Sequence, residues 1–171
     1  MTPTEQEDRR AHVRDRYPVV RTSAKAVVLH CRHLLLVRAV WEGRDCYFLP
    51  GGGQHPGENL ADAARREVYE GTGLTVTPDR LLWVRGYIGA NHEHAATEAA
   101  THRIETVFLR TPTGDPHRLG GQDTDTVQIG LAWVPLEKVP SVDLLPHALR
   151  TLIAALANPG EVPAGHLGGV A

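Results

Sequence analysis

The sequence predicts a single domain of mixed strands and helices, α/β or α+β in class. Two observations support this class: six apolar runs have the length of strands, and two segments repeat apolar residues at helical spacing. The 171 residues suffice for one domain with a sizeable core, and a composition of 42% hydrophobic and 22% charged residues is ordinary for a globular protein. Mixed strands with two helices favour a sheet whose faces are covered by helices.

Strands are expected where apolar and β-branched residues run between turn residues. In chain order they are Ala24–His30, Leu34–Arg38, Tyr47–Leu49, Leu81–Ile88, Arg103–Leu109 and Val127–Val134. The first three runs precede a glycine-rich turn, and the last three follow it. The first helix therefore separates two groups of strands.

The first helix is expected directly after the glycine-rich turn. Asn59 is a good N-cap, and Asp62 adds a carboxylate to the first turn, where the helix dipole favours negative charge. The helix should therefore begin near Leu60. One face repeats apolar residues every four positions and should be buried, while another carries the small Ala63 and two acids. The buried stripe is Leu60, Ala64 and Val68, and the acids are Glu67 and Glu70.

The second helix is expected from Pro146 to about Ala157. Proline suits the first position of a helix, because the N–H that it lacks has no helical partner there. The apolar residues at helical spacing that would form the buried face are Leu149, Leu152, Ile153 and Leu156.

The chain ends and the overall charge indicate the setting of the protein. Residues 1–18 are expected to form a charged arm and residues 158–171 a flexible tail, which leaves residues 19–157 for the domain. The arm lacks the apolar centre of a signal peptide, and two cysteines, Cys31 and Cys46, make no disulfide framework. These features predict a cytoplasmic protein without a membrane span. The net charge of −2 argues against nucleic acid as a partner; the oligomeric state is open, a homodimer included.

Residues 51–74, GGGQHPGENLADAARREVYEGTGL, lead from a glycine turn into the first helix. Glu67 and Glu70 stand three apart, about 5–6 Å at Cβ, close enough to share a divalent cation that substrate phosphates also bind. The glycine spacing is similar to a P-loop, but Glu58 stands where that motif needs lysine, so a cation must lie between loop and nucleotide. For a helix alone, solvated glutamates with Arg66 as an i,i+4 partner would be the simpler interpretation.

The motif resembles the signature of the Nudix hydrolases, G-x5-E-x7-R-E-U-x-E-E-x-G-U, in which U is aliphatic. Within residues 52–74 the chain supplies Gly52, Glu58, Arg66, Glu67, Val68, Glu70, Gly73 and Leu74, preceded by Tyr47-Phe48-Leu49-Pro50 as in many members. The resemblance implies the α/β/α sandwich of that family, with a mixed β-sheet.

The resemblance also implies an activity and roles for residues. Glu67 and Glu70 would bind Mg²⁺ or Mn²⁺, while Arg66 and Glu58 brace the loop against the helix, so that Glu67, Arg66 and Glu58 are the catalytic candidates. The phosphate loop would consist of Gly51, Gly52 and Gly53. The implied reaction is metal-assisted hydrolysis of the diphosphate bond in a nucleoside diphosphate linked to another moiety, a small-molecule substrate.

Gly71 departs from the signature, which has a second glutamate there. Glycine offers no ligand and costs a helix about 1 kcal/mol relative to alanine, so the helix could end early at this point. Three explanations are open: fewer metal ions, an acid from another segment, or a degenerate module that binds a nucleotide or protein partner without turnover. The candidate acids or bases are Asp125, Asp123, Glu105 and Glu93; Glu105 could equally be an outward strand residue, and the aspartates could cap a turn.

Other side chains carry weaker assignments, and the leaving group stays open. A zinc site at His92, His94 and His102 is disfavoured because no cysteine accompanies them, and contact of His92 or His94 with substrate phosphate is preferred. The absence of a G-x-S-x-G elbow disfavours covalent catalysis. Aromatic residues that could stack on a base or fill the core are Trp41, Trp83, Tyr47 and Tyr87. Arginines that could hold phosphates are Arg38, Arg44, Arg85 and Arg103.

Overall fold

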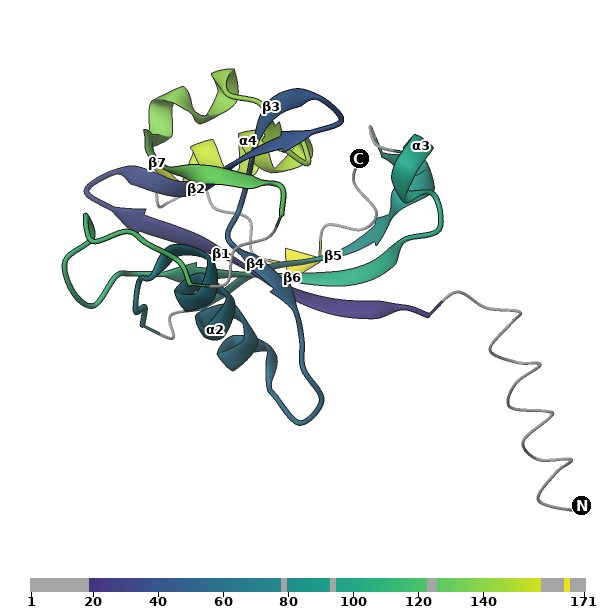
Figure 1. The fold of residues 1–171 in the computed structure, drawn as a ribbon, viewed down its shortest axis with the longest axis horizontal. Helices are drawn as coiled ribbons and strands as arrows, with labels where there is room; N and C mark the ends of the chain where they lie inside the picture. The colour runs from purple at the N-terminus through teal and green to yellow at the C-terminus, as the bar shows by residue number, and fades with distance from the viewer. Residues whose placement is uncertain (1–18, 78–79, 93–94, 123–125, 158–164, 167–171) are drawn as a thin grey trace, which may run out of the picture.

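The computed structural model describes residues 19–77, 80–92, 95–122, 126–157 and 165–166 (Figure 1). Strands form a strongly curved sheet, with helix α2 against one side and helix α4 on the other (Figure 1). This is the α/β/α sandwich that the family resemblance implies. In the described ranges, no helix is both long and apolar enough to cross a membrane.

The sheet is mixed, as expected, and strand β1 lies at its centre. β1 runs parallel to β6 and antiparallel to β4, and it continues through a hairpin into β2. β2 in turn pairs antiparallel with β3 and β7, so the curved sheet has two halves that diverge from β1. The strands are β1 (Arg21–His30), β2 (His33–Trp41), β3 (Arg44–Phe48), β4 (Gly51–Gly53), β5 (Leu81–Ile88), β6 (His102–Arg110), β7 (Gln128–Pro135), β8 (Leu144–Leu145) and β9 (Gly165–His166).

All six predicted strands are present, and three short ones are additional. β4 pairs with β1, β8 pairs with β3, and β9 pairs with β5, each through two or three residues. Such short segments carry no alternating pattern, because their place in the sheet depends on the longer partner strand. β9 also places Gly165–His166, part of the predicted tail, beside Trp83 and Val84.

Helix α2 (Leu60–Thr72) begins where the sequence predicts. The Asn59 side chain caps it by accepting a hydrogen bond from the Asp62 N–H at 2.9 Å. The helix continues through Gly71 to Thr72 and does not end early. It stops at Gly73, whose left-handed φ of 77° turns the chain while its N–H still bonds the Tyr69 carbonyl at 2.8 Å.

Helix α4 (Ala148–Ala154) begins two residues later than predicted. Leu145 belongs to β8, where it pairs with Phe48, and Pro146 follows it directly in the turn that leads into the helix. The predicted start at Pro146 is therefore wrong, because strand pairing of the preceding residue competes with the helix. The chain continues as a short 3₁₀ turn, η3 (Ala155–Ala157), to the predicted end. Of the predicted buried face, Leu149 and Ile153 are fully buried and Leu152 and Leu156 are partly so.

The remaining helical segments are short and lie at strand ends. They are η1 (Gly89–Asn91), α3 (Ala95–Glu98) and η2 (Leu136–Ser141). η1 follows β5 directly, and α3 packs against η1 beyond the end of that strand (Figure 1). They carry no periodic apolar pattern, and none of them was predicted.

The alternation of β1 explains both halves of the core. Ala24, Ala26 and Val28 face helix α2, where small residues let the helix approach the sheet closely. Val27 faces the other way, into the core that α4 covers. Lys25 shares the face of Val27, but it lies nearer the start of the strand, where that face is open. A lysine therefore points into the space between the two halves of the sheet.

Substitution of Gly73 by alanine should destabilise the protein more than substitution of Gly57. Both glycines are left-handed, with φ of 77° and 82°, and a left-handed alanine costs about 1–2 kcal/mol. A Cβ on Gly73 would also lie 2.7 Å from the Gly120 carbonyl oxygen, whereas one on Gly57 meets nothing within 4 Å. Urea unfolding should show the larger loss for Gly73→Ala. Equal losses would mean that the contact with Gly120 costs nothing.

Candidate active site

The Arg66 guanidinium joins the glycine loop to helix α2. Its Nε and one terminal nitrogen bond the two oxygens of Glu58 at 2.9 and 3.0 Å. The other terminal nitrogen donates to Glu67 at 2.9 Å and to Glu70 at 2.8 Å. The terminal nitrogen that binds Glu58 also donates to the Gly53 carbonyl at 2.8 Å. All five N–H donors of the guanidinium are therefore used. The network therefore joins the loop to the helix through Glu58 and Arg66, and the bracing role that the family resemblance implies for this pair stays a prediction.

Glu58 is held as an anion by this network. The hydrogen bonds from Arg66, outweighing partial burial, lower the pKa of Glu58 to about 2, and the His55 N–H adds a further bond at 3.1 Å. The ion pair with Arg66 thus ties the loop to the helix behind it.

Glu67 lies across the missing side chain of Gly52. A Cβ on Gly52 would stand only 2.4 Å from Glu67 Oε2. With any side chain at position 52, the Glu67 carboxylate would have to move from its place in front of the loop. One oxygen of Glu67 is bound by Arg66, and the other faces the loop backbone.

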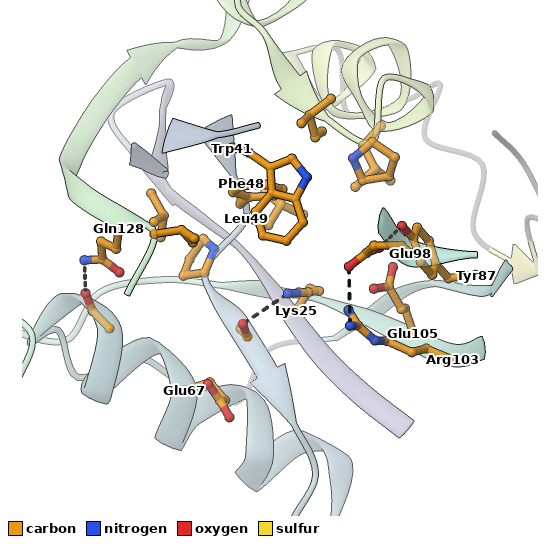
Figure 2. Close-up of a pocket in the computed structure, with 18 of the residues that line it drawn as sticks. Lys25, Trp41, Phe48, Leu49, Glu67, Tyr87, Glu98, Arg103, Glu105 and Gln128 are labelled. Atoms are coloured by element: carbon orange, nitrogen blue, oxygen red, sulfur yellow. Dashed lines mark hydrogen bonds and ion pairs between the residues drawn. The ribbon is translucent and has the colours of Figure 1, made fainter. Parts of the chain in front are cut away.

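A cleft of about 410 Å³ opens beside Glu67 (Figure 2). One wall comes from the half of the sheet that holds β2, β3 and β8 and is apolar, with Trp41, Phe48 and Leu145 among its residues. The opposite wall comes from β1, β5 and β6 and is charged. Gly51, Glu67 and Gly71 close the end nearest α2. The cleft therefore offers an apolar surface and a charged surface to one ligand.

The charged wall is built from paired residues. Arg85 Nε and Glu105 lie opposite each other on β5 and β6 and form a buried ion pair at 2.7 Å. Tyr87 stacks on His92 with ring centroids 4.4 Å apart and donates its O–H to Glu98. Burial and the bond to Glu98 raise the pKa of Tyr87, so its phenol stays protonated.

The candidate acids for the gap at Gly71 have different outcomes. Glu105 lines the cleft and is not an outward strand residue, although Arg85 already binds its carboxylate. Glu93, Asp123 and Asp125 lie outside the described residues. The space over Gly71 is bordered by Gln128, whose amide nitrogen donates to the Gly71 carbonyl at 2.9 Å and whose oxygen lies 3.8 Å from the Cβ position.

The aromatic and arginine candidates divide between the cleft and the core. Trp41, Tyr87, Arg85 and Arg103 line the cleft. Trp83 is fully buried in the core, and Tyr47 packs at its edge. Arg38, Arg44 and His102 are not among the cleft residues, and His94 falls outside the described ranges.

The sequence pattern did not single out every polar residue of the cleft; Lys25, Glu98 and Gln128 are among those it did not indicate as site residues. Lys25 had a visible indication, since it is the one charged residue between Ala24 and Leu29 in an otherwise apolar run. Glu98 and Gln128 had none, because they reach the cleft only through the pairing of β5 with β6 and of β2 with β7.

The carboxylates of Glu67 and Glu70 suit one divalent cation whose remaining ligands would come from water and the substrate. Glu67 and Glu70 each keep one carboxylate oxygen that Arg66 does not bind. Across the described ranges, no group of three or more histidine, cysteine or acidic side chains is arranged to hold a metal. Two carboxylates with water and phosphate oxygens suit Mg²⁺, which rarely relies on protein ligands alone.

The fold and this site define a protein of the Nudix class, and the chain belongs to the family described as NUDIX domain, whose model matches residues 19–156. Human 8-oxo-dGDP phosphatase NUDT18 is 32% identical over 125 residues, 73% of this chain and 34% of that protein. The chain spans about a third of the length of the curated relatives it matches.

Solved structures agree with this fold. A NUDIX hydrolase from Nitrosomonas europaea has a TM-score of 0.66 at 21% identity, covering 85% of this chain and 93% of that one. A MutT NUDIX hydrolase from Burkholderia pseudomallei has a TM-score of 0.59 at 26% identity, covering 79% and 96%.

Replacement of Glu58 by glutamine should reduce the amount of stability that the protein loses in acid. The folded protein binds a proton at Glu58 less tightly than the unfolded chain, with a pKa near 2 against the ordinary 4.5. Its stabilising contribution is therefore complete above about pH 4.5 and is lost as the pH falls toward 2. Melting temperatures at pH 6 and pH 3 should differ less for Glu58→Gln than for the wild type.

The control is Glu137→Gln, which removes an exposed glutamate on η2. It should keep the pH dependence of the wild type. An unchanged pH dependence in Glu58→Gln would show that the ion pair with Arg66 does not stabilise the fold.

Proposed function

We propose that this protein hydrolyses the diphosphate bond of a nucleoside diphosphate or of a nucleoside diphosphate linked to another moiety. The observation that carries the proposal is the Arg66 network, which points the Glu67 carboxylate past Gly52 into a cleft of nucleotide size. An ordinary solvated glutamate needs neither a fully used guanidinium nor a glycine opposite its carboxylate.

The residues of the loop and of helix α2 would have separate roles beside the cleft. Arg66 and Glu58 fix the loop, and Glu67 and Glu70 would hold Mg²⁺ or Mn²⁺ with the substrate. Such a cation would supply neutralisation of charge on the diphosphate. Glu67, which keeps one oxygen that Arg66 does not bind, would accept the proton of a water that attacks phosphorus while the bridging P–O bond breaks. The products are a nucleoside monophosphate and a second phosphate compound.

The two walls of the cleft suit the two parts of a nucleotide. Trp41 and Phe48 offer aromatic surface for a base, and the charged wall faces the phosphates. The name of the relative NUDT18, 8-oxo-dGDP phosphatase, supports a purine nucleoside diphosphate as the first substrate to test.

Glu67→Gln and Glu70→Gln should each reduce turnover by at least about a hundredfold, because one removes a proton acceptor and both remove a metal ligand. Release of nucleoside monophosphate from a panel of nucleoside diphosphates and their derivatives, 8-oxo-dGDP included, measures this, and a chelator should abolish it. Glu137→Gln, an exposed glutamate, is the matched control and should keep full activity. Equal activity of all three variants would refute the assignment.

Gly71→Glu should tighten Mn²⁺ binding by about tenfold, since cation affinity rises with the number of charged ligands. A Cβ fits there, because the nearest atom outside the helix is Gln128 Oε1 at 3.8 Å. Gly71→Ala restores helix propensity without the carboxylate and is the control; calorimetry measures the affinity.

The same pair of variants tests the rival that Gly71 motivates, a degenerate module that binds without turnover. The proposed function requires an active wild-type protein. A wild type without turnover on the panel, together with an active Gly71→Glu variant, would favour the rival.

A further inference from the structure

Lys25 lies in the cleft beside the glycine loop, and none of the assigned roles uses it. Its ammonium donates to the Gly51 carbonyl at 3.1 Å, and its side chain lines the cleft together with Glu67 and Gly71. Figure 2 places it between Glu67 on one side and Glu98, Glu105 and Arg103 on the other. The ammonium therefore lies between the candidate metal-binding carboxylate of Glu67 and the charged wall of the cleft.

Gly51 packs closely against β1 at Lys25. A Cβ on Gly51 would lie 2.9 Å from Lys25 Cδ and 2.3 Å from the Ala24 carbonyl oxygen. Gly51 also has a φ of 143°, a conformation that favours glycine. Glycine at this position thus lets the loop pair closely with the β1 backbone beside the Lys25 stem.

The charge of Lys25 is available, unlike that of its neighbours. Arg85 forms its ion pair with Glu105, and Arg103 lies 3.7 Å from Glu98. Of the lysines and arginines that line the cleft in the described residues, Lys25 alone has no carboxylate within 4.0 Å. A lysine ammonium has three N–H donors, and the Gly51 carbonyl takes one. Two donors remain for an anion.

Gly71 makes its end of the cleft less negative than a glutamate would. The loss of a carboxylate at this position removes one negative charge from the end of the cleft that Lys25 faces. With fewer acids to repel it, a diphosphate can approach a fixed ammonium directly.

We propose that Lys25 is a substrate-binding residue that contacts the diphosphate group through its ammonium and holds it without the help of a metal ion. This rests on the proposed function for its substrate class, but it concerns affinity and not hydrolysis. Lys25 would position the diphosphate against the loop, while Glu67 and Glu70 act on its other side.

The test uses inorganic pyrophosphate with a chelator present, so that no metal contributes. Calorimetry should detect binding to the wild type, and Lys25→Met, which keeps most of the stem, should lose at least about tenfold in affinity, the usual effect of a charge-assisted hydrogen bond. Lys25→Arg should recover part of it. The chain has two lysines, so Lys138→Met on η2, where the residue is exposed, is the matched control and should bind as the wild type. Equal affinity of Lys25→Met and wild type, or no binding by the wild type, overturns the proposal.

A second measurement needs no substitution. Reductive methylation with ¹³C-formaldehyde labels both lysines and keeps their charge. Pyrophosphate should shift the dimethyl signal of Lys25, which Lys25→Arg assigns by its absence, and leave that of Lys138 in place. A Lys25 signal that does not move contradicts the proposal even if Lys25→Met fails to fold.

Kinetics separates this proposal from the function. On a hydrolysed substrate, Lys25→Met should raise KM more than it lowers kcat. Pyrophosphate binding that depends on Lys25, with no hydrolysis of any substrate, would refute the proposed function and support the role of Lys25. Hydrolysis of a substrate, together with pyrophosphate binding that does not depend on Lys25, would support the proposed function and refute the role of Lys25.

Discussion

The site depends on one guanidinium. Three carboxylates, those of Glu58, Glu67 and Glu70, meet within hydrogen-bond distance of Arg66 and would repel one another without it. Arg66 also binds the Gly53 carbonyl, so it holds the loop and the helix in one arrangement. A lysine has three donors and no planar fork, so it could not satisfy the same five contacts. Because Arg66 binds one of its two carboxylate oxygens, Glu67 has a fixed direction before any ligand arrives.

Glycines determine how closely the charged groups approach. Gly52 leaves space for the Glu67 carboxylate, and Gly51 leaves space for the Lys25 stem. Gly71 has a different effect, since it adds open space and removes an expected charge. The cleft therefore has a carboxylate and an ammonium on either side of one glycine strand, β4. That combination suits a ligand that carries its own negative charge and recruits a cation on one side only.

The curvature of the sheet gives the cleft its two chemical characters. β2, β3 and β8 contribute Trp41, Phe48 and Leu145, while β1, β5 and β6 contribute charged residues. Along each strand, successive side chains point to opposite faces of the sheet. The cleft forms where the two halves of the sheet diverge, beyond core residues such as Val27. On β1, a two-residue step from Val27 to Lys25 is enough to pass from packed core to open cleft.

The sequence by itself determined the long elements and the loop-helix motif. Asn59 capping, the six strand-length runs and the spacing of Glu58, Arg66, Glu67 and Glu70 are local, and local geometry brings those groups together. The sequence could not determine which distant residues join them. Glu105, Glu98, Gln128 and Lys25 reach the cleft through strand register, which depends on pairing between segments far apart in the chain. Tertiary structure also decided that Trp83 lies in the core and Trp41 in the cleft, because burial depends on which sheet face is covered and not on the residue itself.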